Sequence, residues 1–238
     1  MDLLPHQHAV THGGHGKRHV ESALDACLGV PENPSSEPVS TGTTILALRC
    51  VDGVVLAADT RTSAGGYIVN RASRKISPVH DRIFVCRSGS AADTQYLTTM
   101  VKMYIAQHAQ ELGKAPTVKA VASIFRLLCY QNKDQLTAGL IVAGFDDEMG
   151  YQVYSIPVGG AIFEAPYAIG GSGSIFISGL IEVSYNESMT VAEAHLLAQQ
   201  LVSRAISNDG SSGGMVRSII VQKDGLKESV LLGNEVPL

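Results

Sequence analysis

The chain has 238 residues, of which 45% carry apolar side chains, and this is enough for a single domain with a sizeable core. A formal net charge of −4 gives it no electrostatic footprint for nucleic acid or for an anionic membrane surface. Its longest apolar stretches, such as residues 139–144, are the length of a strand and far below that of a bilayer span. We therefore expect a protein that neither binds nucleic acid nor inserts into a membrane.

Residues 1–41 differ in composition from the rest of the chain. Histidines lie among glycines in the first half of this segment, and prolines and serines follow between residues 31 and 38. Such a segment has little to bury, so we expect a flexible leader. Metal binding by the histidines is disfavoured, because their spacing is irregular and neither a carboxylate nor a thiolate completes a site. The segment also lacks the continuous apolar core of a secretory signal.

The cysteines are widely scattered and include no C-x-x-C pair or metal-ligand spacing. We expect them to be reduced, buried thiols of an intracellular protein. They are Cys27, Cys50, Cys86 and Cys129.

Short β-prone runs begin directly after the leader. Residues 44–50 and 54–58 flank Asp52-Gly53, a tight-turn sequence, and therefore predict a hairpin. Residues 83–87 predict a further strand, which Ser88-Gly89-Ser90 ends.

Helical periodicity follows. Residues 91–112 carry apolar side chains at intervals of three and four, which predicts an amphipathic helix. Thr117, behind Pro116, is expected to begin a second helix. Thr190 is expected to cap another long helix, with Glu193 in the capping-box position. The buried stripe of that helix is expected to comprise Leu196, Leu197, Leu201 and Ile206.

The remaining predicted elements are short. They are strands at 140–145, 151–156 and 161–164, a helix from about 174 to 185, and a closing hairpin of 215–222 and 228–232. Strands thus come in hairpin groups and helices in pairs, which favours antiparallel sheets over the βαβ alternation of a parallel sheet. We expect an α+β fold in which two antiparallel sheets pack face to face and helix pairs cover their outer faces.

A nucleophile is available at the junction between leader and domain. A threonine hydroxyl needs a neighbouring base. If the chain began at Thr43, its own α-amino group, with a pKa of about 7.7–8.0, would supply that base. Gly42 suits cleavage at this bond, because a residue without a side chain lets the Thr43 hydroxyl reach its carbonyl. An N-to-O acyl shift followed by hydrolysis would release the leader.

Other catalytic sites find less support. Beyond the leader the histidines are His80, His108 and His195, and the last two fall on predicted helices. Neither a G-x-S-x-G elbow nor an H-E-x-x-H motif is present. The glycine-rich run at 170–174 lacks the Lys-Ser/Thr of a phosphate-binding loop.

Several separated segments carry a resemblance to a known family. They are residues 41–45, 53–62, 75–76, 87–95 and 209–214. In their order and spacing they resemble a proteasome β subunit, from Gly42 almost to the C-terminus. The run Arg-Ser-Gly-Ser-Ala-Ala-Asp-Thr-Gln at 87–95 resembles the β1 type, which has caspase-like activity. The resemblance implies the N-terminal-nucleophile hydrolase fold, a four-layer αββα sandwich, over residues 43–238 and a propeptide over residues 1–42 that is removed on maturation.

The resemblance also implies roles for individual residues. Thr43 would be the nucleophile and, through its amine, the proton acceptor. Lys75 would lower the pKa of the Thr43 hydroxyl and amine, and Asp59 would hold Lys75 in place. The Gly89 N–H would bind the oxyanion. The residues expected around the α-amino group are Ser172, Asp209 and Ser212.

A substrate pocket is implied in the same way. Arg87 at its floor would favour an acidic side chain before the scissile bond, because guanidinium and carboxylate pair bidentately. Ser73 stands where threonine is expected, a change that would widen the pocket slightly. The expected substrate-binding residues are Thr62, Ser63, Ser73, Arg87, Ala91 and Gln95.

Simpler interpretations stay open for each residue alone. Asp59 could form a turn at a strand end, Lys75 could be a solvated surface lysine, and Arg87 could belong to a surface salt bridge. Ser172 and Ser212 could be small residues in glycine-rich loops. For the whole chain the alternatives are a bacterial HslV-like peptidase that forms homo-oligomeric rings, an inactive structural ring subunit that keeps its leader, and a metal-binding module in the leader.

Partners and surroundings follow from the resemblance only. It implies assembly with other proteasome α and β subunits in a four-ring barrel, unfolded polypeptides as substrates, and a place in the cytoplasm and nucleus. Neither a cofactor nor a metal is expected.

Overall fold

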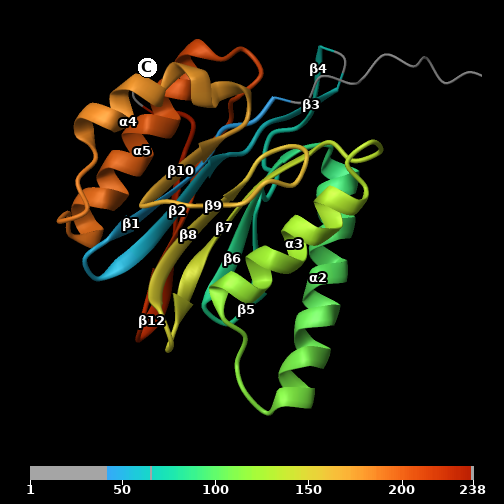
Figure 1. Cartoon of the computed structure of the whole chain (residues 1–238). Coiled ribbons are helices and arrows are strands. Elements are labelled where there is room, and N and C mark those ends of the chain that lie inside the picture. Colours follow the sequence, from blue (N-terminus) through green and yellow to red (C-terminus); the bar gives the residue numbers. More distant parts are fainter. Residues whose placement is uncertain (1–41, 65, 237–238) are drawn as a thin grey trace, which may run out of the picture. The chain divides into compact units, whose positions relative to one another are not determined.

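The computed structural model describes residues 42–64 and 66–236, and the predictions for the leader and for Cys27 lie outside this part. Two five-stranded antiparallel sheets form its centre (Figure 1). The first has the order β10-β1-β2-β11-β12. Its strands are β10 (Tyr167–Gly170), β1 (Ile45–Cys50), β2 (Gly53–Asp59), β11 (Val216–Gln222) and β12 (Gly225–Leu231).

The second sheet has the order β5-β6-β7-β8-β9, and a separate two-stranded ribbon pairs β3 with β4. All of the pairings are antiparallel. The strands of the second sheet are β5 (Ile76–His80), β6 (Ile83–Gly89), β7 (Ala138–Asp146), β8 (Gly150–Ile156) and β9 (Phe163–Glu164). The ribbon consists of β3 (Thr62–Ala64) and β4 (Tyr67–Asn70).

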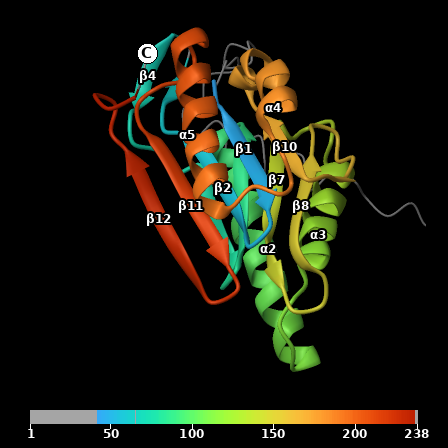
Figure 2. The ribbon, with the colours of Figure 1, turned by 90° about the vertical axis from the view of Figure 1, so that its left-hand side faces the viewer.

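Helices cover the outer face of each sheet (Figures 1 and 2). The first sheet packs against α4 (Ser178–Ser184) and α5 (Val191–Asn208), and the second packs against α2 (Ala91–Leu112) and α3 (Val118–Gln131). A third apolar cluster lies between the sheets and joins residues such as Leu56 and Ile141. Three cores between four layers confirm the predicted αββα sandwich.

Local signals explain the well-predicted elements. Helix α2 has the predicted bounds, and Thr117 caps α3 by accepting a hydrogen bond from the Ala120 N–H. Thr190 and Glu193 form the expected capping box of α5. The predicted stripe of α5 is wrong at Leu196, which is 57% exposed. The small residues Ala194, Ala198 and Ala205 are buried instead, because α5 packs closely on the sheet.

Other strands were not predicted. β5 contains Pro78, a residue confined largely to sheet edges, and β5 is indeed an edge strand. β10 is only four residues long and lies between Pro166 and Gly171. β3 and β4 are also short, and the ribbon they form is only partly buried, so little hydrophobic alternation marks them.

The described cysteines, Cys50, Cys86 and Cys129, are buried free thiols as predicted. Burial raises the pKa of the Cys50 thiol to about 11. None of the helices in residues 42–64 and 66–236 is long and apolar enough to span a membrane.

Asp146 fixes the second sheet to α3. Its Oδ2 accepts hydrogen bonds from the Val118 N–H at 2.8 Å and from Gln152 Nε2 at 2.7 Å. Its Oδ1 accepts hydrogen bonds from the N–H groups of Glu148 and Met149 in the turn after β7. Burial raises the pKa of Asp146, but these hydrogen bonds outweigh it and the net pKa lies below its ordinary value.

We predict that Asp146→Ala lowers the free energy of unfolding by about 3 kcal/mol, because it leaves several buried donors without an acceptor. Asp147→Ala is the matched control: Asp147 is exposed and pairs with Arg82 at the surface, so its loss should cost less than about 1 kcal/mol. Urea denaturation of the purified chain measures both. The stability from Asp146 should be complete above its ordinary pKa of about 3.9 and be lost as the pH falls through its lower folded-state pKa. Equal losses for the two variants would contradict this role.

Candidate active site

Thr43 lies at the entrance to β1 and is 5% exposed. Its carbonyl accepts a hydrogen bond from the Gly173 N–H at 3.2 Å. A Cβ atom on Gly171, which has a φ of +82°, would overlap with the Thr43 carbonyl. The close approach of the 171–173 loop therefore requires glycine and holds the Thr43 backbone in place.

Lys75 contacts the Thr43 hydroxyl directly. Its Nζ donates to Thr43 Oγ1 at 3.0 Å, to the Gly42 carbonyl at 3.3 Å and to Asp59 Oδ1 at 2.6 Å. These partners occupy all three N–H groups of an ammonium. The Thr43 hydroxyl in turn donates to the Gly42 carbonyl at 2.7 Å. Lys75 is 7% exposed, so it is not a solvated surface lysine.

Asp59, fully buried at the end of β2, is fixed by backbone donors as well as by Lys75. Oδ1 accepts from the Thr44 N–H at 2.9 Å, and Oδ2 accepts from the N–H groups of Arg61 at 3.2 Å and Gly213 at 3.0 Å. Burial lowers the pKa of Lys75 below its ordinary value, although the neighbouring Asp59 carboxylate opposes this shift. The lysine is thus more acidic than a solvated one and is held against the threonine hydroxyl.

The Thr43 nitrogen lies beside a second hydrogen-bonded group. Its N–H donates to Ser172 Oγ at 3.1 Å. The hydroxyls of Ser172 and Ser212 both donate to Asp209 Oδ2 at 2.7 Å. Burial raises the pKa of Asp209, but the hydrogen bonds from Ser212 and Ser172 and the charge of Lys75 bring the net pKa below its ordinary value. Asp209 is therefore an ionised acceptor that orients both serines.

Gly42 has no room for a side chain. A Cβ atom at this position would overlap with Ser211, in the loop that follows α5. The carbonyl of residue 42 can therefore lie beside Thr43 Oγ1 and Lys75 Nζ only when residue 42 is glycine.

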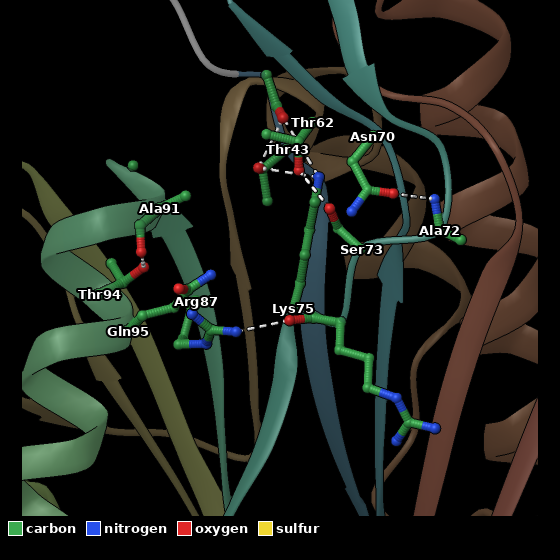
Figure 3. A pocket seen from close by; sticks show the side chains of 13 residues that line it. Thr43, Thr62, Asn70, Ala72, Ser73, Lys75, Arg87, Ala91, Thr94 and Gln95 are labelled. Carbon is green, nitrogen blue, oxygen red and sulfur yellow. Dashed lines mark hydrogen bonds between the residues drawn. The ribbon is translucent and has the colours of Figure 1, made fainter.

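A pocket of about 270 Å³ opens beside Thr43 and is hereafter called the threonine pocket (Figure 3). It contains the predicted Thr62, Ser73, Arg87, Gly89, Ala91 and Gln95. Ser63 does not line it. Four further lining residues were not predicted from the sequence, and they are Asn70, Ala72, Arg74 and Thr94. Thr94 lies within the 87–95 motif and could have been found there, whereas Asn70 ends a strand that was not predicted.

Thr62 and Ser73 lie together on one wall, where their hydroxyls form a hydrogen bond of 2.6 Å. Gly89 has a φ of +98°, and a Cβ atom there would overlap with the Thr137 carbonyl. Its backbone conformation thus requires glycine at the pocket edge.

Arg87 is the charged group of this pocket that lacks an acidic partner among the residues described. It is 9% exposed, and its Nη2 donates to the Arg74 carbonyl at 2.6 Å, while its Nε has no hydrogen-bond partner. None of the ion pairs in the described part of the chain involves it. Burial lowers the pKa of its guanidinium. The alternative of a surface salt bridge is therefore wrong for Arg87.

Among residues 42–64 and 66–236, no aspartate or glutamate lines the threonine pocket. Two of its three cationic side chains are already paired, Lys75 with Asp59 and Arg74 with Glu228 at 3.6 Å. Among the described residues, no cluster of three or more His, Cys, Asp or Glu side chains could hold a metal ion.

Comparison with known proteins agrees with this geometry. The sequence model of the family described as "Proteasome subunit" matches residues 39–221. The chain is 46% identical over 199 residues to "Proteasome subunit beta type-6" of Dictyostelium discoideum, covering 84% of this chain and 93% of that protein. It is also 46% identical over 203 residues to "Probable proteasome subunit beta type-1" of Schizosaccharomyces pombe, covering 84% and 90%. "Proteasome subunit beta type-9" of Salmo salar is 41% identical over 202 residues, covering 85% and 93%. The chain therefore belongs to the proteasome subunit family, as a 20S proteasome β subunit of the β1/β6 type.

Proposed function

We propose that the chain is the precursor of a threonine endopeptidase subunit that cleaves peptide bonds after acidic residues, with Thr43 as the nucleophile. The observation that carries this proposal is the 3.0 Å contact between Lys75 Nζ and Thr43 Oγ1, with Asp59 holding the lysine. The domain boundary expected from the sequence, a propeptide over residues 1–42 and a hydrolase domain over 43–238, is part of the same proposal.

The first step is removal of the leader. Thr43 Oγ1 attacks the Gly42 carbonyl carbon, the C–N bond to Thr43 breaks, and the released nitrogen takes up the hydroxyl proton. Charge develops on the Gly42 carbonyl oxygen, to which Lys75 Nζ already donates at 3.3 Å. Water then hydrolyses the resulting ester, which leaves a carboxylate on Gly42 and a free amine and hydroxyl on Thr43.

The mature subunit uses the same groups on a substrate. The Thr43 α-amino group accepts the hydroxyl proton as Oγ1 attacks the scissile carbonyl, and the amine then gives that proton to the leaving nitrogen. Ser172 lies 3.1 Å from the Thr43 nitrogen and is held by Asp209, so it orients the amine. The Gly89 N–H is assigned to the oxyanion. Water hydrolyses the acyl-enzyme and restores Thr43.

The preference for acidic side chains rests on Arg87. Among the described residues, its buried guanidinium has no carboxylate partner and its pocket has no acidic lining residue, which favours a substrate carboxylate that pairs with it.

The alternatives differ in what they require. An inactive ring subunit has no need of an ordered Asp59–Lys75–Thr43 contact, and an HslV-like peptidase would form an active ring from this chain alone. The similar proteins carry the names beta type-6 and beta type-1. These names support assembly of this chain with other α and β subunits in a hetero-oligomeric barrel. Unfolded polypeptides as substrates and a location in cytoplasm and nucleus stay predictions. The N-terminal sequence of the assembled subunit tests the proposal, because a chain that keeps its leader cannot use the Thr43 amine.

We predict that Gly42→Ala slows leader removal by about a hundredfold, because its Cβ overlaps with Ser211 and displaces the scissile carbonyl from Thr43. Gly210→Ala, in the same loop as Ser211, is the matched control, since a Cβ there meets no atom within 4 Å. Intact-mass measurement of the assembled particle over time gives both rates. Normal processing of the Gly42→Ala chain would show that the observed geometry is not the reactive one.

In a chain that already begins at Thr43, Lys75→Met should reduce peptide hydrolysis by about 10²–10³-fold, because it removes the charged donor to Thr43 Oγ1. It also leaves Asp59 buried without its ion-pair partner, which destabilises the fold. The double variant Asp59→Asn/Lys75→Met removes both charges and separates the two effects: we expect it to recover part of the thermal stability, because one amide oxygen still accepts backbone N–H groups, but not activity. Activity within tenfold of wild type in either variant would refute the role of Lys75.

Arg87→Ala should lower kcat/KM for peptides cleaved after Glu by about a hundredfold, the value of a lost charged hydrogen-bonded pair, and change cleavage after Leu by less than about threefold. Arg74→Ala is the control, because Arg74 lines the same pocket but is 67% exposed and pairs with Glu228. Fluorogenic peptides with Glu or Leu before the scissile bond measure the ratio in the assembled particle. An unchanged ratio would exclude Arg87 as the specificity residue.

A further inference from the structure

Arg87 lines two pockets. Besides the threonine pocket it lines a second pocket of about 310 Å³, bounded by Pro78 and by polar residues of β5, β6 and α2. Gln95 is also shared between the two pockets. In Figure 3, Arg87 lies between Lys75 on one side and the α2 residues Ala91, Thr94 and Gln95 on the other. Arg87 is thus shared between the two pockets, and the substrate side chain is expected in only one of them.

The second pocket is cationic. Besides Arg87 it contains Lys102, and no aspartate or glutamate of the described part of the chain lines it. The side chain of Lys102 forms no ion pair or hydrogen bond with the residues of the described chain. Two positive charges therefore border one hollow without a negative group, an arrangement that attracts a small anion.

The α2 wall of this pocket is built for polar contact. Gln95, Thr98, Thr99 and Lys102 are spaced i, i+3, i+4 and i+7, so they share one face of the helix. Thr98 and Thr99 donate their hydroxyl protons to the carbonyls of Thr94 and Gln95. The donors that remain for a ligand are the Gln95 amide, the Lys102 ammonium and the Ser77 hydroxyl from β5, none of which has a partner among the described residues.

The strongest evidence for a ligand is the Nε of the Arg87 guanidinium, which is unpaired among the described residues. Arg87 Nε is buried without a hydrogen-bond partner in this part of the chain, and such a group costs free energy unless a ligand satisfies it. The side chain is more than nine-tenths buried, so water does not readily take the place of that missing partner.

We propose that the second pocket binds a small inorganic oxyanion of the phosphate or sulfate type between Arg87 and Lys102, and that this anion weakens the binding of acidic substrates. Both negative groups are attracted to the same guanidinium, and they repel each other across it. Binding at one face must therefore lower affinity at the other by the same factor. Neutral substrates carry no charge into the threonine pocket, so the bound anion does not weaken their binding. This inference rests on the proposed acidic preference.

Steady-state kinetics of the assembled particle, with inorganic phosphate as the probe, test the coupling. A bulky organosulfonate salt keeps the ionic strength constant. We expect saturating phosphate to raise KM for a Glu-ending peptide by about tenfold, within the usual range of coupling between sites, and to leave KM for a Leu-ending peptide unchanged. Lys102→Met should reduce the effect to less than about twofold. Lys119→Met removes an exposed lysine of α3 and should preserve it.

The Lys102 variant also separates the two pockets, because Lys102 lines only the second. If phosphate simply occupied the threonine pocket, the phosphate effect would survive Lys102→Met, and the proposal would be wrong. Equal phosphate effects on Glu and Leu peptides would overturn it as well.

A structural readout does not depend on activity. Selenate, an anomalously scattering analogue of sulfate, is soaked into crystals of the assembled particle. A peak between Arg87 and Lys102 that disappears in Lys102→Met supports the proposal even if the subunit proves inactive. A peak in the threonine pocket alone, no peak at either place, or an acidic side chain of a neighbouring subunit filling the second pocket overturns it, whatever the outcome for the proposed function.

Discussion

The site depends on one buried ion pair, Lys75 with Asp59, at 2.6 Å. Removing two charges from water costs several kcal/mol per ion, and their attraction offsets this only when further hydrogen bonds complete both groups. Here they do. Asp59 accepts backbone N–H groups from three separate places, residues 44, 61 and 213, and Lys75 uses its remaining protons on Thr43 and Gly42. The pair can therefore form only after β1, β2 and the loop before β11 have come together.

This constraint links the fold to the chemistry. β1 and β2 form a hairpin, which brings residue 44 opposite the end of β2, where Asp59 lies. Lys75 enters from the other sheet, immediately before β5. Thr43 and Lys75 thus belong to different layers of the sandwich, and packing of the two sheets sets the distance between them. Loosening the core between the sheets should disturb this contact before it disturbs either sheet.

Three helices, the first hairpin and the candidate nucleophile could be predicted from the sequence. Periodicity and caps located α2, α3 and α5, and Asp52-Gly53 located the first hairpin, because these signals are local. Thr43 was predicted as the nucleophile because it follows the leader directly and because no histidine was a suitable base. Asp59 and Lys75 came only from the resemblance, because nothing local distinguishes a buried lysine before an unpredicted edge strand from a solvated one.

The pocket was the least predictable part. Asn70 ends β4 and Arg74 lies shortly before β5, and no local signal marked those segments. Ser63 was expected there but lies in β3, where its register partner is Ile68. Burial of Arg87 without a carboxylate depends on how α2 packs on β5 and β6, which is a tertiary property. The sequence could predict the positive charge of Arg87 in the threonine pocket. It could not predict that Arg87 has no carboxylate partner among the described residues.

The position of Ser172 between Asp209 and the Thr43 nitrogen has a further consequence for the proposed chemistry. In the precursor this nitrogen is an amide that can only donate, and it donates to Ser172 Oγ. In the mature subunit the same nitrogen must accept a proton from Oγ1 and later release it. A hydroxyl can both donate and accept, whereas a carboxylate only accepts. A carboxylate in direct contact would favour the protonated amine, so less of the neutral amine would be available as the base. Placing Ser172 between them lets Asp209 orient the amine without that effect, so one arrangement serves both maturation and turnover.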